Sequence, residues 1–206
     1  MEEHYVSRAT KRLILMGKTT CQRCNGEGKA QSPFIGLIEP MDLPGCEIGS
    51  GSMGYGLPFG VGFALAKKLK KEEGTVYVIM SDGEMAIGTT WESGLIAYHH
   101  LNENLRVIID ANGWQAMGKT NDVLHIEPIR KKWEAMGWRV LEIDGHNCEQ
   151  IEKALSYSFA ESIAPICIIA RTVKGKGVSF MEDQNDWHYR AIDKESYELA
   201  TKELGQ

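Results

Sequence analysis

TVYVIMSDGEMAIGTTWESGLIAYHHLNENLRVIIDANGWQAMG, the stretch from Thr75 to Gly118, decides the fold of this chain. It holds two apolar runs, residues 76–80 and 105–109, separated by a segment of helix length. The first run ends on Asp82 and Gly83, and the second leads to Asn112. We therefore predict a β-α-β unit in which two neighbouring parallel strands carry Asp82 and Asn112 at their carboxyl ends, where open α/β sheets bind ligands.

The same alternation continues on both sides of this stretch. Apolar runs predict strands over residues 75–80, 105–110, 139–143 and 166–171. Helical patterns are expected over residues 3–16, 58–71, 89–100, 127–137, 147–160 and 193–204, with an extended segment over 17–47. This order is typical of an α/β fold of three layers, a mostly parallel sheet with helices on both faces.

Length and composition indicate a single globular domain spanning residues 1–206. Hydrophobic residues make up 43% of the chain and charged residues 25%, which excludes disordered and collagen-like classes. The net charge of -5 argues against a nucleic-acid partner. The sequence has no apolar run long enough to span a membrane and no signal-peptide core, so we expect a cytoplasmic protein with no membrane partner.

Five cysteines, an odd number, are spread along the chain, which favours reduced thiols. Cys21 and Cys24 have the C-x-x-C spacing of a zinc knuckle. A tetrahedral zinc site needs two further ligands, and no second such pair follows, so the loop interpretation is favoured over a metal shared with another chain.

A glycine-rich turn, Gly49-Ser50-Gly51-Ser52-Met53-Gly54, matches G-x-G-x-x-G literally. A dinucleotide fingerprint requires a preceding strand and an acidic residue about 20 positions later. Here Pro40 and Pro44 lie in the preceding segment, and the next strand ends about 30 residues on, at Asp82. The turn therefore indicates close backbone approach to a ligand rather than nicotinamide binding.

Asp82 and Asn112 together offer a hard, low-charge set of oxygen ligands. Such a set suits Mg²⁺ or Ca²⁺ completed by phosphate oxygens, and it does not suit zinc. Both residues are also common at helix starts and in turns, so spacing alone leaves a structural role open.

The stretch resembles the thiamine-diphosphate signature, in which G-D-G is followed about 30 residues later by Asn, and specifically its transketolase form. The resemblance runs from about Met41 to Ile192. It includes the turn GSMGYGLPFGVGFALA, residues 173–177 (VKGKG) and the pair Trp187-His188. These features look like the N-terminal, diphosphate-binding subunit of a split transketolase, and they imply the thiamine-diphosphate-binding fold.

The resemblance implies roles for individual residues. Asp82, the Asn112 side chain and the Trp114 carbonyl would bind Mg²⁺, with Ca²⁺ as an alternative ion. Thiamine diphosphate would be contacted by residues of the glycine-rich turn, the acidic turn and the distal segment, namely Gly51, Met53, Gly54, Gly83, Glu84 and His188. His188 would also take part in proton handling as a catalytic residue, and Glu92 matches a catalytic acidic residue at the subunit interface.

The sequence also departs from the family pattern. Ser81 stands where Gly is usual, which leaves the metal ligand intact, and Ile87 stands where Glu is usual, which breaks any proton relay there. Tyr55 and Tyr189 are further differences. The chain is expected to start late relative to the family, so the family's N-terminal histidine-bearing segments would either precede residue 1 or have no counterpart.

The resemblance implies a two-subunit enzyme. In such enzymes the glutamate that activates the pyrimidine belongs to a second α/β domain, so a separate pyrimidine-binding, C-terminal transketolase-like subunit is expected, in a heterotetramer. The implied reaction transfers a two-carbon ketol unit between sugars or sugar phosphates. The alternatives are a subunit of another thiamine-dependent enzyme, either 2-oxo acid decarboxylating or acyloin-forming, and a non-catalytic cofactor-binding scaffold subunit.

Overall fold

The computed structural model describes Ile48 and residues 52–157 and 164–205. Nearly all of these belong to one compact unit, Met53–Gln206, and the description below concerns that unit. The helix expected over residues 3–16, the extended segment over 17–47 and the Cys21–Cys24 pair lie outside the described residues.

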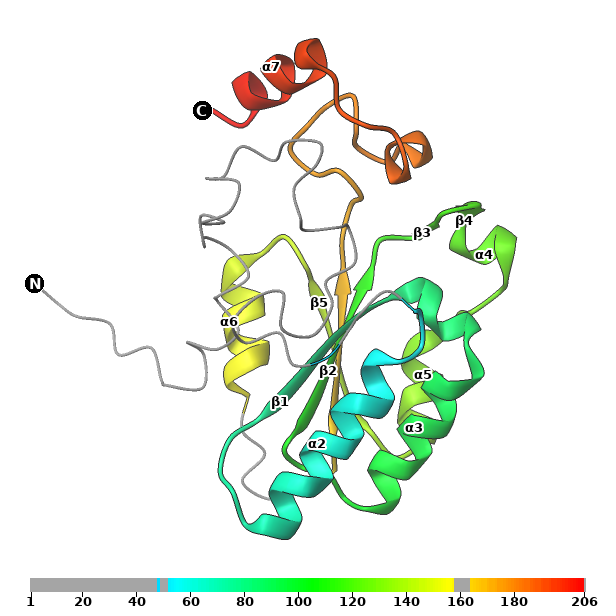
Figure 1. Cartoon of the computed structure of the whole chain (residues 1–206), viewed down its shortest axis with the longest axis vertical. Coiled ribbons are helices and arrows are strands. Elements are labelled where there is room, and N and C mark those ends of the chain that lie inside the picture. The colour runs from blue at the N-terminus through cyan, green and yellow to red at the C-terminus, as the bar shows by residue number, and fades with distance from the viewer. Residues whose placement is uncertain (1–47, 49–51, 158–163, 206) are drawn as a thin grey trace, which may run out of the picture. The chain divides into compact units, whose positions relative to one another are not determined.

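A parallel four-stranded sheet forms the centre of the unit (Figure 1). Each apolar run of the sequence becomes one strand, and every neighbouring pair is parallel. The strands in spatial order are β1 (Val76–Ser81), β2 (Leu105–Ala111), β6 (Ile166–Arg171) and β5 (Arg139–Asp144). The prediction that the first two strands are adjacent and parallel is confirmed, with Met80 in register with Ile109.

Helices cover both faces of the sheet, as the alternation predicts (Figure 1). One face is covered by α2 (Gly56–Lys70), α3 (Gly88–His99) and α5 (Ile129–Ala135), and the other by α6 (Cys148–Ser156). The last helix, α7 (Lys194–Glu203), follows the final strand, β6, in the sequence. Asn147 caps α6 and Asp193 caps α7, each accepting a hydrogen bond from the backbone N–H three residues on.

The main core lies between the sheet and the three-helix face. Its aromatic centre is Trp133 on α5, which is fully buried and contacts the Trp138 ring edge-on at 4.7 Å. The Trp91 ring on α3 lies 6.0 Å from that of Trp133, tilted by 40°. The polar edges of these rings are satisfied, since the Trp138 indole donates to the Gly94 carbonyl at 2.9 Å. Trp133 and Trp138 are buried members of this core, and Trp91 is partly buried against it.

The opposite face is covered less completely. Ala154 of α6 packs on Ile166 and Ile168, so β6 is buried on both sides, as its apolar sequence predicts. On β1, however, Ile79 is 66% exposed. Ile79 is exposed because α6 packs against the β5 and β6 side of the sheet, whereas β1 forms an edge of the described sheet.

Several short elements at the carboxyl edge of the sheet are not predicted by the sequence patterns. The acidic turn is a 3-10 helix, η2 (Asp82–Ala86), and β2 is followed by a small antiparallel hairpin. The remaining short elements are β3 (Trp114–Gln115), β4 (Gly118–Lys119), α4 (Thr120–Val123) and η3 (Asn185–His188). Across the described ranges, no helix has the length and apolar character needed to cross a membrane.

Candidate functional site

Asp82 is a buried carboxylate at the carboxyl end of β1, with only 3% of its surface exposed. Its Oδ2 accepts hydrogen bonds from the Gly113 backbone N–H at 2.8 Å and from the Thr120 hydroxyl at 3.2 Å. Its Oδ1 is buried and has no hydrogen-bond partner among the described residues. One oxygen is therefore fixed by the protein, while the other lacks a hydrogen bond and can accept a ligand.

The environment of Asp82 disfavours a bare negative charge. Burial raises the pKa of the Asp82 carboxyl, although interactions with the Gly113 N–H, the Thr120 hydroxyl and the Gly83 N–H act in the opposite direction. A nearby carboxylate, Asp110, raises it further. A cation bound to Oδ1 would offset the free-energy cost of burying the charged carboxylate, because it supplies the opposite charge.

The turn after β2 is joined directly to Asp82 through Gly113. Within the turn, Asn112 Oδ1 accepts a hydrogen bond from the Trp114 backbone N–H at 2.9 Å, and Asn112 Nδ2 donates to Asp110 Oδ2 at 3.3 Å. Gly113 has a φ of +79°, a left-handed conformation that glycine adopts without strain. The two turns predicted to meet therefore do meet, and the linking contact is the hydrogen bond from the Gly113 backbone N–H to the Asp82 carboxylate.

The set of possible metal ligands here is small. It consists of one carboxylate, one amide oxygen and, in the hairpin that follows, the Trp114 carbonyl. No group of three or more His, Cys, Asp or Glu residues suited to a metal ion occurs within residues 52–157 and 164–205. Such a set fits a hard cation that takes most of its oxygens from a phosphate or from water.

The glycine-rich turn is bonded to the acidic turn. The Gly54 N–H donates to Glu84 Oε2 at 3.0 Å, and the Thr89 hydroxyl donates to the Gly54 carbonyl at 2.9 Å. Gly54 has a φ of +82°, and a Cβ there would lie 2.3 Å from Ile87 Cγ2. Only glycine fits this close approach, and Met53 beside it is half exposed. Gly51 lies outside the described residues.

The segment that carries His188 is attached to the β3–β4 hairpin. The Trp114 indole N–H donates to Asp183 Oδ1 at 2.5 Å, and Asn185 Nδ2 donates to the Ala116 carbonyl at 3.1 Å. His188 is exposed at the end of η3, with its ring 4.8 Å from that of Tyr189. It forms no hydrogen bond to Asp82 or Asn112, so the structure brings its segment to the hairpin without joining the imidazole to the buried carboxylate.

Glu92 lies apart from these contacts. It is exposed on α3, and within the part of the chain that the structure describes it forms no ion pair or side-chain hydrogen bond. Ile87, which precedes α3, is half-buried against Gly54. The position where the sequence resemblance implies a Glu therefore holds an apolar side chain that packs against Gly54.

A hollow of about 400 Å³ opens at the same edge of the sheet. Asn112 lines it together with Asp110, Thr172 and His146, whereas Asp82 does not. His146 Nε2 accepts a hydrogen bond from the Val173 N–H at 2.7 Å, which fixes the imidazole at the rim of the hollow. The hollow thus borders the candidate metal site through Asn112.

Sequence reasoning missed several residues that shape the site. Thr120 bonds to Asp82, Asp183 bonds to Trp114, and Gln115 lies beside Gly83. None of them belongs to a motif with a fixed spacing. A threonine at the start of a short helix and an aspartate in a glycine-containing segment are ordinary capping and turn residues, so the patterns carry no signal for them.

Comparison with known proteins gives a consistent family. A family model described as "Transketolase, thiamine diphosphate binding domain" matches residues 29–206. An apulose-4-phosphate transketolase subunit of Phocaeicola vulgatus is 37% identical over 166 residues, which covers 81% of this chain and 59% of that protein. A 6-deoxy-6-sulfo-D-fructose transketolase subunit of a Clostridium species is 35% identical over 160 residues, covering 78% of this chain and 58% of that protein.

Solved structures agree with the sequence comparisons. Transketolase of Campylobacter jejuni superposes with a TM-score of 0.73 at 30% identity, covering 78% of this chain and 26% of that one. The chain thus spans less than two thirds of the length of the relatives and the structure named here.

Proposed function

The chain belongs to the family of transketolase thiamine diphosphate-binding domains, and we propose that it is the diphosphate- and magnesium-binding subunit of a two-subunit transketolase-like enzyme. The reaction would transfer a two-carbon ketol unit between sugars or sugar phosphates. In this proposal all 206 residues form one cofactor-binding domain that works in the cytoplasm.

One observation carries the proposal. Asp82 is buried at the carboxyl edge of the sheet. Its Oδ2 accepts two hydrogen bonds, and its Oδ1 has no partner among the described residues. A Mg²⁺ ion would be held by Asp82 Oδ1, by the Asn112 side chain and by the Trp114 carbonyl, with diphosphate oxygens completing its coordination. Ca²⁺ is the alternative ion.

Other residues would then surround the cofactor. Gly83 and Glu84 would line the diphosphate, and the hydrogen bond between Glu84 and Gly54 would fix the backbone beside Met53, so that Met53 presents its backbone to the aminopyrimidine. His188 would contact the diphosphate and handle a proton. The cofactor, when bound, supplies the carbon nucleophile of ketol transfer, and this chain contributes binding and orientation.

The relatives support the class of substrate and the need for a partner. Their names specify a sugar phosphate and a sulfosugar, and both are described as subunits of transketolases. We infer that this chain likewise needs a separate pyrimidine-binding, C-terminal transketolase-like subunit. Glu92, exposed on α3, would lie at that subunit interface.

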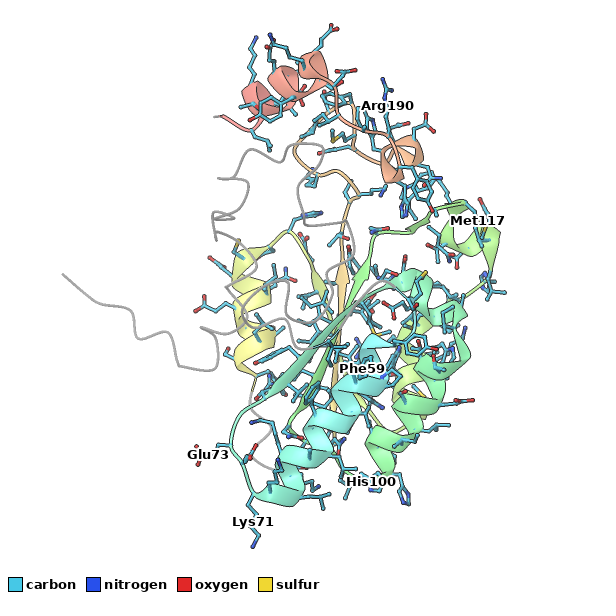
Figure 2. The ribbon with its side chains drawn as sticks, viewed as in Figure 1. Phe59, Lys71, Glu73, His100, Met117 and Arg190 are labelled. Carbon is cyan, nitrogen blue, oxygen red and sulfur yellow. The ribbon has the colours of Figure 1, made fainter. Side chains whose placement is uncertain are left out.

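An exposed apolar surface on α2 and α3 supports a larger assembly, the heterotetramer. The two helices pack together, and their exposed side chains include large apolar groups. Figure 2 marks Phe59 on α2. These exposed groups are Phe59 and Phe63 on α2 and Leu95 and Ile96 on α3, each 43–55% exposed. Apolar surface of this kind gains stability when another chain covers it.

A non-catalytic cofactor-binding subunit is the second candidate, and Ile87 favours it. Its side chain packs on Gly54 and offers no proton donor or acceptor. Activity of the purified complex separates the two candidates. Ketol transfer by this chain together with its partner supports an enzyme, whereas cofactor binding without turnover supports a scaffold.

Thermal unfolding tests cofactor binding directly. At Mg²⁺ and thiamine diphosphate concentrations about 100-fold above the dissociation constant, the complex of the 206-residue chain and its partner should gain about 5–10 °C in Tm. Asp82→Asn should abolish the gain and leave the unliganded protein folded, because it removes a buried charge and keeps an oxygen acceptor. Asp122→Asn, at an exposed carboxylate of α4, is the matched control. The absence of a shift in the wild-type complex would contradict the proposal.

A further inference from the structure

The carboxamide of Gln115 is a buried polar group whose donor is unused. Gln115 follows Trp114 in β3, and its Nε2 is buried without a hydrogen-bond partner among the described residues. Each N–H that folding removes from water without a replacement acceptor destabilises the protein. A glutamine held in this way is explained if an acceptor from outside the described residues arrives at Nε2.

The position of the Gln115 side chain identifies where that acceptor would come from. A Cβ added at Gly83 would lie 3.2 Å from Gln115 Cγ and 3.3 Å from Gln115 Cδ. The same Cβ would lie 3.4 Å from Met53 Cε. Gln115 and Met53 therefore both lie against Gly83, the residue next to the buried carboxylate Asp82.

The unused groups around Gly83 are complementary in chemistry. Asp82 Oδ1 is an unpartnered acceptor that suits a cation, and Gln115 Nε2 is an unpartnered donor that suits an anionic or neutral oxygen. A metal-bound diphosphate presents both partners at once, since it brings the cation and several acceptor oxygens. A ligand with only a cation would leave the Gln115 donor unsatisfied.

We propose that the Gln115 carboxamide is a further cofactor-positioning group, which donates a hydrogen bond from Nε2 to an oxygen of the bound diphosphate. This inference rests on the proposed function and deepens it. It explains why a glutamine, rather than an apolar residue of similar volume, lies against Gly83. The site it describes has two parts, a cation held by Asp82 and an anionic oxygen held by Gln115.

A competing structural explanation involves Asn185. Its Oδ1 is likewise buried and unpartnered among the described residues, and the segment around it is attached to the hairpin through the Ala116 carbonyl. If the two amides were to rotate and satisfy each other, Gln115 would stabilise the unliganded protein. The cofactor-positioning role predicts the opposite, so the stability of the unliganded protein distinguishes the two explanations.

The test uses Gln115→Met, which preserves the length of the side chain and removes the amide. Measurements are made on the full chain with its partner, by titration with thiamine diphosphate and, separately, with inorganic diphosphate, both with Mg²⁺. We expect both dissociation constants to rise about 10-fold, the effect of losing one hydrogen bond to a charged acceptor. We expect the Tm of the unliganded protein to stay equal or rise, because an unsatisfied donor has been removed.

Two further variants sharpen the result. Gln115→Glu replaces the donor with a negative charge, so it should weaken binding of both diphosphates more than Gln115→Met does. Gln184→Met, at an exposed glutamine of the same side-chain length, should change neither affinity nor Tm.

The proposal is overturned if Gln115→Met leaves both affinities unchanged, or if it lowers the Tm of the unliganded protein while affinity is retained. The second result would assign the amide an internal partner such as Asn185. If the wild-type complex binds thiamine diphosphate normally, these outcomes concern Gln115 alone. If the wild-type complex does not bind it, the proposed function fails and this inference fails with it.

Discussion

The indole N–H of Trp114 donates a hydrogen bond to Asp183 Oδ1 at 2.5 Å, across 69 positions of the chain. Trp114 follows the turn after β2 that contains Asn112, and Asp183 lies in the segment that leads to His188. Figure 2 marks Met117 in the hairpin that contains Trp114. Because the Trp114 carbonyl is a proposed metal ligand, this one residue would connect the metal to the segment that carries the proposed catalytic histidine.

Loss of this indole donor should loosen the His188 segment. Trp114→Phe keeps an aromatic ring and removes a hydrogen bond to a carboxylate, so residues 176–188 should open about 10-fold more often. Hydrogen exchange of these amides measures the opening. Trp91→Phe, which removes an indole donor to the Met85 carbonyl, is the matched control and should leave these amides unchanged. Equal exchange in both variants would show that the Trp114 contact does not hold the segment.

The Thr120 hydroxyl should matter for metal affinity. Thr120→Val is nearly isosteric and leaves Asp82 Oδ2 with only the Gly113 N–H. We expect about 1–2 kcal/mol of lost stability. We expect Mg²⁺-dependent cofactor binding to weaken about 10-fold, as is typical when a residue that orients a metal ligand is removed. Isothermal titration of the complex measures the affinity. Thr120→Ser keeps the hydroxyl and should restore most of it; a serine variant as weak as the valine variant would argue against a role for the hydrogen bond.

Because Gly54 and Ile87 are closely packed, we expect substitutions at these two positions to have strongly coupled effects on stability. Gly54→Ala places a Cβ 2.3 Å from Ile87 Cγ2, in a backbone conformation with φ of +82°. The overlap and the backbone strain together should cost about 3 kcal/mol. Ile87→Ala removes the overlapping methyl, so the double variant should regain part of that loss while the strain persists. Urea denaturation of the four proteins gives the coupling energy. Strictly additive effects would mean that the two residues are not in contact.

The ion pair between Glu127 and Arg171 should make the folded protein less stable in acid. Burial acts to raise the pKa of Glu127, but hydrogen bonds from Arg171 and from the Ile129 N–H outweigh it and lower the pKa below its usual range. Since the folded pKa is the lower one, the pair stabilises the protein above the unfolded pKa and loses this contribution as the pH falls through the folded value.

Denaturant unfolding at neutral pH and at about pH 4 tests this sign, the unfolded carboxyl titrating near this pH. Glu127→Gln should reduce the difference between the two pH values. Glu134→Gln, which affects an exposed pair with Arg130, should leave the difference as in the wild type. If Glu127→Gln keeps the full acid sensitivity, the loss of stability originates elsewhere.

The sequence predicts the sheet well because its strands are short apolar runs bounded by polar turns. Val107 and Ile109 alternate with half-buried residues along β2, and β6 is apolar throughout. The starts of α6 and α7 are also apparent in the sequence, because Asn147 and Asp193 are typical helix-capping residues at the beginning of helical patterns. These features depend on neighbours in the chain, which a sequence displays directly.

Contacts between distant residues could not be predicted in the same way. The bond from Thr120 to Asp82 spans 38 positions and depends on how the β3–β4 hairpin folds back. The hairpin strands have two residues each, too few to produce a hydrophobic period. The exposure of Ile79 depends on which strands α6 covers, and that is a property of the assembled sheet.

The buried carboxylate of Asp82, with one oxygen lacking a hydrogen bond, has a consequence for how fast the protein is degraded in the cell. A fold that keeps a desolvated charge for a ligand is most vulnerable when that ligand is scarce. If the proposed cofactor binds there, newly made chains would be cleared by proteases faster during thiamine or magnesium starvation than in replete cells. The amount of this protein would then follow the supply of its cofactor without any dedicated regulator.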